Sequence, residues 1–280
     1  MIARVNDSGA WSTAEGAASW QASAAQRERA MAETTELLLS AAGVAPGSRV
    51  LDLGAGTGDV ALRLAKRVGA KGSVLATDAS AAMLEIAARL AKEAGATNVA
   101  TLAVRAEELD LPASSFDAAI SRNALMFVTD LRRAFRAVRS ALRRGGRFAA
   151  SVWGPAERNP FHGVPIAAVR RRGAIPDPPP EVVQAFTLSD GETVASALRE
   201  AGFTGVEMRR ARAARSFPSL EDALRTAREF PTFVALLGSL SAEEREEAWQ
   251  EIAREWRRFA AGGRVEMPGE QLVISGENPR

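Results

Sequence analysis

The hydrophobic pattern of this chain alternates between short apolar runs and longer stretches in which apolar residues recur at helical spacing. Residues 49–53 form one apolar run, which is followed by glycines at alternate positions and then by helical spacing from Val60 to Val68. This order predicts a buried strand, a glycine turn and a helix. Similar runs predict further strands at 73–78, 99–104, 116–121 and 147–152. Because helical stretches separate the runs, the pattern favours a parallel sheet covered by helices on both faces.

The helices between these runs carry local signals for their ends. Ser80 can cap a helix that Gly95 closes, and Asp130 can cap a helix that we expect to end at the glycine pair 145–146. Side-chain oxygens favour such positions because they accept hydrogen bonds from the free amides of the first helical turn. The sequence over 241–244 predicts a capping box for one more helix.

Both ends of the chain add segments to this core. Residues 1–12 are polar and predict an arm, and the apolar spacing from Trp20 to Ala41 predicts one or two helices. In the second half, helical segments are expected at about 155–187, which includes the proline-rich stretch 176–180, and also at 189–201 and 219–262, with strands at 206–215 and 271–275.

The last of these strands decides how the domains are divided. If 271–275 pairs into the sheet, the segment 219–262 is an insertion between the final two strands rather than a separate domain. We therefore predict an N-terminal helical cover over 1–45 and one α/β domain over 46–280. Its mostly parallel sheet would have seven strands, and its helical insertions would form a cap.

Composition narrows the possible chemistry. The chain has no cysteine, which excludes disulfides, thiolate zinc sites and a covalent cysteine mechanism, and no metal site is expected. Its 36 basic and 34 acidic residues nearly balance, so charge gives no argument for a nucleic-acid partner. No apolar stretch approaches the ~18 residues of a membrane span, and the layout of a secretory signal is missing. We expect a cytoplasmic protein.

The glycine turn indicates a binding site for an electron-rich ligand. Glycines let a ligand approach the backbone closely, and the following helix presents its positive N-terminus there. Dinucleotide-binding proteins use the spacing G-x-G-x-x-G with an acid about 20 residues further on. Here the glycines at 54, 56 and 58 follow G-x-G-x-G, and the acid is Asp78 at the end of the second predicted strand.

Five short motifs give the chain a resemblance to a known family. They are Val50-Leu51-Asp52-Leu53-Gly54-Ala55-Gly56-Thr57-Gly58, Thr77-Asp78-Ala79-Ser80 followed by Met83-Leu84, Ala106-Glu107 before Leu111-Pro112, Ser115-Phe116-Asp117, and Leu142-Arg143-Arg144-Gly145-Gly146-Arg147-Phe148. Over about residues 45–153 the sequence resembles the class I S-adenosylmethionine-dependent methyltransferases, in particular the branch like the ubiquinone/menaquinone C-methyltransferases. The resemblance implies a Rossmann-like, doubly wound sheet and methyl transfer from S-adenosylmethionine, which leaves S-adenosylhomocysteine.

The resemblance also implies which residues hold the cofactor. The glycine-loop amides would meet its methionine portion, Asp78 would accept from both ribose hydroxyls, and Asp52 or nearby carbonyls would take the ammonium group. The expected cofactor residues are Asp52, Gly54, Ala55, Gly56, Gly58, Asp78, Ala79, Met83, Ala106, Glu107, Ser121 and Arg122. One position departs from the family, because Arg105 stands where relatives often carry an acceptor for the adenine amino group. We expect Arg105 to point outward or to pair with an acid.

The acceptor is expected in the half of the protein that holds the insertions. A small, apolar or aromatic molecule would lie among residues after the fourth strand and in the cap, namely Asn123, Met126, Phe127, Trp153, Phe161 and Phe233. The lone histidine, His162, is a candidate general base, but the sequence supplies no orienting partner for it and favours a histidine packed beside Phe161. Trp20 either covers the cofactor or anchors a helix. The family's sequence for methylating base amines, Asn/Asp-Pro-Pro-aromatic, is missing after Ser121.

Three other functions stay open from the sequence. A nicotinamide-dependent oxidoreductase uses the same sheet, but its glycine spacing would place glycine where Asp59 stands. A binding module can keep a fold without its catalysis. An RNA methyltransferase would bind RNA in a salt-sensitive way. The identity of the acceptor, the atom methylated and the oligomeric state are not determined by these patterns.

Overall fold

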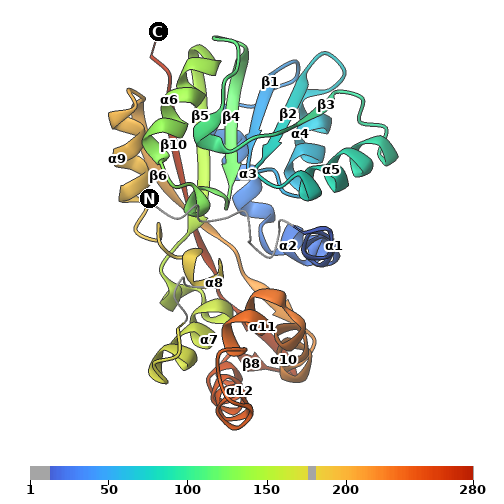
Figure 1. Cartoon of the computed structure of the whole chain (residues 1–280), viewed down its shortest axis with the longest axis vertical. Helices are drawn as coiled ribbons and strands as arrows, with labels where there is room; N and C mark the ends of the chain where they lie inside the picture. Colours follow the sequence, from blue (N-terminus) through green and yellow to red (C-terminus); the bar gives the residue numbers. More distant parts are fainter. Residues whose placement is uncertain (1–12, 176–180, 280) are drawn as a thin grey trace.

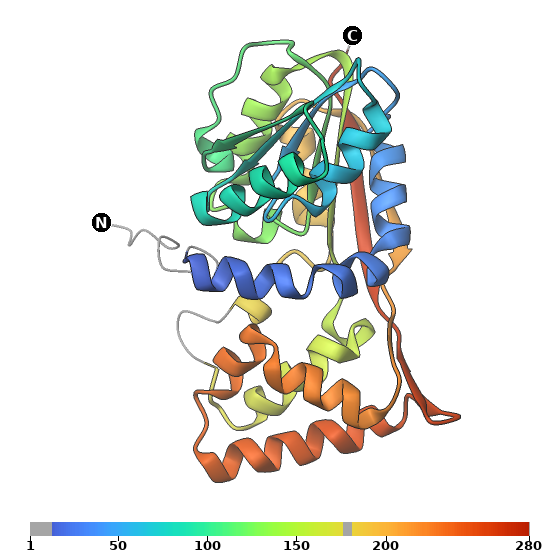
Figure 2. The same cartoon turned by 90° about the vertical axis from the view of Figure 1, so that its right-hand side faces the viewer.

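The structure is a computed structural model that describes residues 13–175 and 181–279. The predicted arm at 1–12 and the proline stretch at 176–180 lie outside the described residues. An α/β sheet region occupies one end of the molecule and a helical cap the other, with the first helices between them (Figures 1 and 2).

The central sheet has seven strands in the order β3-β2-β1-β4-β5-β10-β6. These strands are β1 (Arg49–Leu53), β2 (Ser73–Asp78), β3 (Val99–Ala103), β4 (Phe116–Arg122), β5 (Leu142–Trp153), β6 (Thr204–Arg212) and β10 (Glu270–Glu277). Neighbouring strands from β3 to β5 pair in parallel, whereas β10 runs antiparallel to both β5 and β6. The predicted seven-stranded, mostly parallel sheet is confirmed, including the pairing of 271–275.

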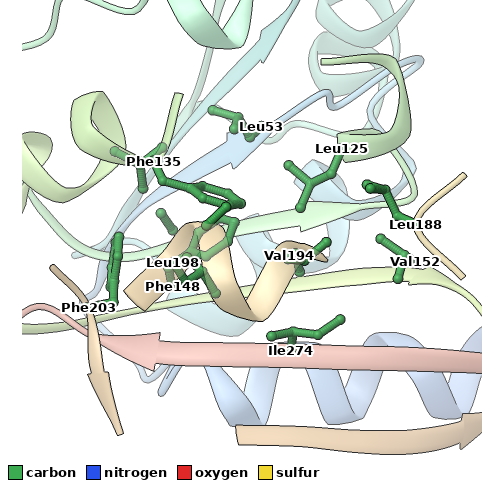
Figure 3. Close-up of a cluster of buried hydrophobic side chains, with 14 of the residues drawn as sticks. Leu53, Leu125, Phe135, Phe148, Val152, Leu188, Val194, Leu198, Phe203 and Ile274 are labelled. Atoms are coloured by element: carbon green, nitrogen blue, oxygen red, sulfur yellow. The ribbon is translucent and has the colours of Figure 1, made fainter. Parts of the chain in front are cut away.

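Helices cover both faces of the sheet because its central strands are apolar on both sides. Successive side chains of a strand point to opposite faces, and Val50 and Leu51 accordingly belong to different apolar clusters. One cluster includes side chains of α3 (Ala32–Ala41), α4 (Asp59–Val68) and α5 (Ala81–Glu93). The other includes side chains of α6 (Leu131–Ala141) and α9 (Glu192–Glu200). In it, Phe135 of α6 lies against Phe148 of β5, with their ring centroids 5.3 Å apart (Figure 3).

The N-terminal segment forms three helices where the spacing predicted one or two. These are α1 (Ala14–Ala22), α2 (Ala24–Ala30) and α3. The chain leaves helical geometry at Ser23 and at Met31, where the backbone lies near ψ 0°. Consequently α1 and α2 run across the molecule between the sheet and the cap, while α3 turns onto the sheet (Figure 2).

The cap consists of helices and a small antiparallel sheet. Its elements are α7 (Pro160–Arg171), α8 (Glu181–Gln184), α10 (Leu220–Glu229), α11 (Pro231–Leu237), α12 (Ala242–Arg257), β7 (Arg215–Phe217), β8 (Ala260–Ala261) and β9 (Arg264–Met267). They share a third apolar cluster that includes Phe161, Phe233 and Trp256. The segment 219–262 lies along the chain between β7 and β9, and β10 follows it back into the central sheet; its assignment as an insertion in one domain stays a prediction. A long ribbon, β6–β7 with β9–β10, joins the cap to the sheet (Figure 2).

The predicted helix caps are confirmed, and the predicted bounds that differ from the structure have physical causes. Ser80, Asp130 and Ser241 cap their helices through their side-chain oxygens. The helix after Asp130, however, ends at Ala141 and not at the glycine pair 145–146, because Leu142 is extended and pairs with Phe116 of β4. The predicted strand 206–215 is divided into β6 and β7. Short 3-10 helices occur at η2 (Ala106–Glu108), η3 (Leu125–Phe127) and η4 (Ala156–Arg158).

No helix within 13–175 and 181–279 combines the length and the apolar character that crossing a membrane requires.

Candidate active site

A cavity of about 290 Å³ lies at the carboxyl ends of β1, β2 and β4, between the sheet and the cap. Open α/β sheets bind their ligands at this edge. Every predicted cofactor residue except Gly58 lines the cavity, and so do Asn123, Met126, Phe127 and Trp153 from the predicted acceptor set. The cavity therefore has two ends. We call the part lined by the predicted cofactor residues the sheet end, and the part that faces the cap the cap end.

The glycine loop is shaped by close packing, not by free amides. The amides of Gly54 and Ala55 both donate to the carbonyl of Thr77, and the amide of Gly56 donates to Asp78. The amide of Gly58 donates to Ala55. The protein thus uses these amides to attach the loop to the end of β2, and their contact with the methionine portion stays a prediction.

Two of the glycines are required by what lies beside them. A Cβ atom on Gly54 would come within 2.2 Å of the Cβ atom of Ala124, which follows β4. A Cβ atom on Gly58 would come within 2.8 Å of the Cβ atom of Ala87 on α5. Gly58 therefore serves the packing of α4 against α5 and does not line the cavity, and its assignment as a cofactor residue stays a prediction.

Asp78 is held rigidly at the end of β2. Its Oδ2 atom accepts from the amide of Gly56 and its Oδ1 atom accepts from the amide of Ser80, both at 2.8 Å. Burial raises the pKa of Asp78, and these backbone hydrogen bonds oppose the rise. Since each carboxylate oxygen has a second lone pair, the side chain can still accept a pair of hydroxyl groups from a ligand.

Asp52 is a buried acid whose second oxygen is not satisfied. It is 1% exposed and lines the cavity, and its Oδ2 atom has no hydrogen-bond partner among the residues that the structure describes. Burial raises the pKa of Asp52 to about 7; Arg122 opposes this rise, and the charges of Asp78 and Asp59 add to it. The Oγ atom of Ser121 in the same wall is also buried and has no hydrogen-bond partner within 13–175 and 181–279. These groups fit a ligand that brings a cationic donor, as an α-ammonium group would.

The wall beyond β3 contains the position that departs from the family. Arg105 lies 3.2 Å from the Oε1 atom of Glu107, which also accepts from the hydroxyl of Thr129 at 2.7 Å. Burial raises the pKa of Glu107, but the hydrogen bonds from Thr129 and Arg105 outweigh it and hold the pKa below its ordinary value. The expectation that Arg105 pairs with an acid is confirmed.

The N-terminal helices contribute a charged residue that the sequence did not reveal. Arg27 of α2 is 3% exposed and lies 2.7 Å from the Oδ2 atom of Asp59, at the start of α4. Its guanidinium carbon lies 4.0 Å from the centre of the Trp20 ring. All three side chains line the cavity. Arg27 stands among many surface arginines in the sequence, and only the packing of α2 against α4 distinguishes it.

Arg122, at the end of β4, is fastened to the same helices. Its Nη1 atom donates to Glu28 and, at 2.9 Å, to the hydroxyl of Thr35. The predicted cofactor residue Arg122 thus lines the cavity while it anchors α2 and α3 to the sheet. Trp20 is half-buried and faces the cavity, so its position agrees with the cover interpretation; its contact with a cofactor stays a prediction.

The aromatic residues of the cap are divided between the cavity and the core. Trp153 and Phe230 line the cavity, together with Val182 and Ala185. Phe161 and Phe233, which were also predicted for the acceptor pocket, do not line it. Phe161 stacks on Phe217 and Trp256 at centroid distances of 5.6 and 5.3 Å, and Phe233 is 0% exposed. They face inward because they belong to the cluster that holds the cap together.

His162 lines the cap end of the cavity, and no described residue hydrogen-bonds to its ring to orient it. Its ring centroid lies 4.9 Å from that of Trp153 and 5.1 Å from that of Phe161. Burial, together with the nearby charge of Arg215, lowers the pKa of His162 well below its ordinary value. The ring is therefore neutral at pH 7 and does not bind a proton strongly enough to act as an effective base.

Arg215, the first residue of β7, also lines the cap end of the cavity. It is 6% exposed, and its guanidinium carbon lies 4.5 Å from the centre of the Phe161 ring. Thr232 lines the cavity nearby and its Oγ1 atom is buried without a partner in the described ranges. Neither residue belongs to a motif, so no pattern in the sequence distinguishes them.

Comparison with known sequences gives matches to the sheet region. Residues 50–146 match the family model described as a methyltransferase domain. The ubiquinone/menaquinone biosynthesis C-methyltransferase UbiE of Vibrio cholerae is 36% identical over 110 residues, 39% of this chain and 42% of that protein. The UbiE protein of Cellvibrio japonicus is 37% identical over 110 residues, 39% of this chain and 44% of that protein. The chain thus spans less than half the length of these curated relatives.

Solved structures extend the likeness in fold to most of the chain. The YcgJ protein of Bacillus subtilis has a TM-score of 0.55 and 22% identity, covering 88% of this chain and 98% of that one. Phosphoethanolamine N-methyltransferase 2 of Haemonchus contortus has a TM-score of 0.58 and 19% identity, covering 96% of this chain and 58% of that one. The [4+2]-cyclase SpnF has a TM-score of 0.52 and 20% identity, covering 88% and 80%.

At these identities the structural likeness shows the fold alone, and a cyclase among the neighbours illustrates that a fold does not fix a reaction. The domain match, by contrast, covers the glycine loop, Asp78 and the Ala106-Glu107 motif. A nicotinamide-dependent oxidoreductase is not favoured by these matches. Over residues 50–146 the chain is therefore similar to S-adenosylmethionine-dependent methyltransferase domains, in agreement with the resemblance of its motifs.

Proposed function

We propose that this chain transfers a methyl group from S-adenosylmethionine to a nitrogen, oxygen or carbon atom of a small molecule bound at the cap end of the cavity. The observation that carries the proposal is the buried Asp52 carboxylate, which lines the cavity and whose Oδ2 atom has no partner among the described residues. A buried carboxylate needs a cation or a hydrogen-bond donor, and the cofactor's ammonium group would be both.

The remaining cofactor roles follow from the positions of the lining residues. Asp78 would accept from the ribose hydroxyls with its second lone pairs. Ala79 and Met83 would pack on the adenine ring, with Ala106 and Glu107 at its edge. Because the glycine-loop amides are already used, the cofactor's carboxylate would be met by the cations Arg27 and Arg122, both of which line the cavity.

The protein's contribution to the reaction would be positioning. S-adenosylmethionine supplies a methyl group on a sulfonium sulfur, which an acceptor atom displaces in line. Holding two reactants in such a geometry can supply ~7–11 kcal/mol of a barrier. The helices α1 and α2 lie between the sheet and the cap (Figure 2), where they would cover the cofactor and exclude water. Residues 1–45 would therefore act as a cover and 46–280 as the methyltransferase domain.

His162 would position the acceptor and would not remove its proton. Its neutral ring can accept a hydrogen bond from an acceptor hydroxyl or amine, or donate one to an acceptor oxygen. Its lowered pKa disfavours the protonated form that a general base must reach. The apolar rings beside it favour a small molecule over RNA, which supports the same choice of acceptor.

Calorimetry with S-adenosylhomocysteine tests the proposal. We expect the wild-type protein to bind and Asp78→Ala to lose about 1.5–3 kcal/mol of binding free energy, since charge-assisted hydrogen bonds have this strength. Asp110→Asn, which removes an exposed acid outside the cavity, is the matched control and should bind as the wild type does. An unchanged affinity in folded Asp78→Ala would refute the cofactor assignment. Transfer of a labelled methyl group to a panel of small acceptors tests the reaction itself.

A further inference from the structure

The cap end of the cavity contains a buried cation without a counter-ion. Arg215 is 6% exposed, yet no carboxylate among the described residues lies within ion-pair distance of it, and its guanidinium makes no hydrogen bond there. The other arginines in the cavity wall are different, because Arg27 pairs with Asp59, Arg105 with Glu107 and Arg122 with Glu28. Burial lowers the pKa of Arg215 to about 10, so the side chain is still charged at pH 7.

Removing a charge from water without pairing it is strongly unfavourable. Where a folded protein keeps such a group at the wall of a cavity, a ligand of opposite charge is the simplest partner. The aromatic contact of Arg215 with Phe161 holds one face of the guanidinium, at 4.5 Å from the ring centre. It does not use the in-plane N–H donors, which match the two oxygens of a carboxylate or phosphate.

Two other polar groups line the same end of the cavity. The hydroxyl of Thr232 is buried and has no partner in the part of the chain that the structure describes, and the ring of His162 makes no hydrogen bond within those residues. Hydroxyl and imidazole groups both donate to oxyanions. The rest of this wall is apolar and includes Trp153, Val182 and Phe230.

We propose that the methyl acceptor carries one anionic group, a carboxylate or a phosphate, on an apolar or aromatic body, and that Arg215 and Thr232 bind that group. The inference rests on the proposed methyl transfer and names the substrate class for the same cavity. It revises the expectation of a largely apolar acceptor. The anion would lie against the cap, so that the apolar body extends toward the sheet end, where the methyl group is delivered.

Binding of simple probes to the protein saturated with S-adenosylhomocysteine tests this inference. The probes are benzoate, phenyl phosphate and the neutral benzyl alcohol, each titrated by calorimetry at pH 7.5. We expect at least one of the two anions to bind at least about 10-fold more tightly than benzyl alcohol, because charge-assisted hydrogen bonds are the strong ones. Preference for benzoate assigns a carboxylate, and preference for phenyl phosphate assigns a phosphate.

Variants separate Arg215 from general surface charge. Arg215→Met keeps the length of the side chain and should weaken anion binding by about 10-fold or more, while the affinity for S-adenosylhomocysteine stays within twofold. Thr232→Val should weaken it by a smaller factor. Arg209→Gln, an exposed arginine on β6, is the matched control and should change nothing. Ligand-free Arg215→Met should also melt at a higher temperature than the wild type, because an unpaired buried charge has been removed.

The outcomes separate the two proposals. If S-adenosylhomocysteine binds but neither anion binds better than benzyl alcohol, or if Arg215→Met binds the anions as the wild type does, the inference about the acceptor is wrong and the cofactor assignment stands. A lower melting temperature in Arg215→Met would likewise count against an unpaired cation. Failure of S-adenosylhomocysteine to bind the wild type would overturn the proposed function itself.

Discussion

The two ends of the cavity differ in how their charges are balanced. The sheet end contains several acids whose charges are balanced within the protein. Asp78 accepts a hydrogen bond from the glycine loop, and Asp59 forms an ion pair with Arg27. The cap end has the reverse character, with Arg215 unpaired among the described residues and surrounded by aromatic rings. At the sheet end most charges are paired within the protein and an acid, Asp52, is left for a ligand, whereas at the cap end a cation is left for a ligand.

The largest expected effect tests which aromatic residues belong to the cap core. Phe233→Ala should lower the free energy of unfolding by about 3–5 kcal/mol, because it leaves a cavity where a side chain is fully buried. Phe230→Ala, only three residues away and lining the cavity, is the matched variant. It should cost less stability and raise the acceptor KM. Denaturant unfolding measures the loss of stability, and steady-state kinetics measure the acceptor KM. Equal loss of stability in both variants would contradict the assignment of Phe233 to the cap core and of Phe230 to the cavity wall.

Gly54→Ala tests how tightly the sheet end is built. The added Cβ atom would meet Ala124 at 2.2 Å with a backbone φ of +71°, so we expect a loss of roughly 2–4 kcal/mol in the free energy of unfolding. Gly69→Ala has a similar φ of +67° but open space around it, and isolates the backbone cost at roughly 1–2 kcal/mol. Chemical denaturation of the two variants gives the difference. Identical losses would show that Gly54 is not constrained by the loop after β4.

Asp52→Asn tests whether the carboxylate proposed to bind the cofactor lowers the stability of the folded protein. The pKa of Asp52 is about 7 in the folded protein, above its ordinary value of 3.8, so the folded state binds this proton more tightly than the unfolded chain. Asp52 therefore makes folding less favourable as the pH rises from about 4 to about 7. We expect Asp52→Asn to increase the free energy of unfolding by roughly 1–3 kcal/mol at pH 8 and to have little effect at pH 4.

The same substitution should act in the opposite direction on binding. In the wild type, the affinity for S-adenosylhomocysteine should fall as the pH drops below about 7, because protonation removes the charge that holds the ammonium group. Asp52→Asn should bind weakly at every pH. Thermal melts and calorimetry between pH 5 and pH 8 measure both properties. A stability difference that does not change with pH would rule out Asp52 as the titrating group.

The smallest effect is expected at Arg105. Its ion pair with Glu107 is partly exposed, and such pairs contribute ~0–1 kcal/mol. Arg105→Gln should change stability within that range and leave the affinity for S-adenosylhomocysteine nearly unchanged, since Thr129 still donates to Glu107. A large loss of affinity would show that Arg105 contacts the cofactor directly. The sheet end would then bind the cofactor through this cation as well as through its acids.

The sequence by itself determined the features that depend on neighbours along the chain. The alternation of apolar runs gave the strands, side-chain caps gave the starts of several helices, and the position of Asp78 at the end of a strand placed it beside the glycine loop. Parallel strands bring their carboxyl ends to one edge, so the local order was enough to predict the sheet end of the cavity. The end of the helix at Ala141 was missed because Leu142 is held in extended geometry by a strand partner 26 residues away.

Only the tertiary structure decided the residues whose role depends on distant partners. Arg27 is distinguished from other arginines by Asp59, which is 32 residues further along the chain. The raised pKa of Asp52 comes from burial beneath the packed helices. Phe161 and Phe230 have the same chemistry, but one faces the core and the other faces the cavity. Arg215 belongs to no motif. It matters because the ribbon that contains β7 places its charge inside the protein. Burial removes water from the guanidinium there, and no described carboxylate pairs with it.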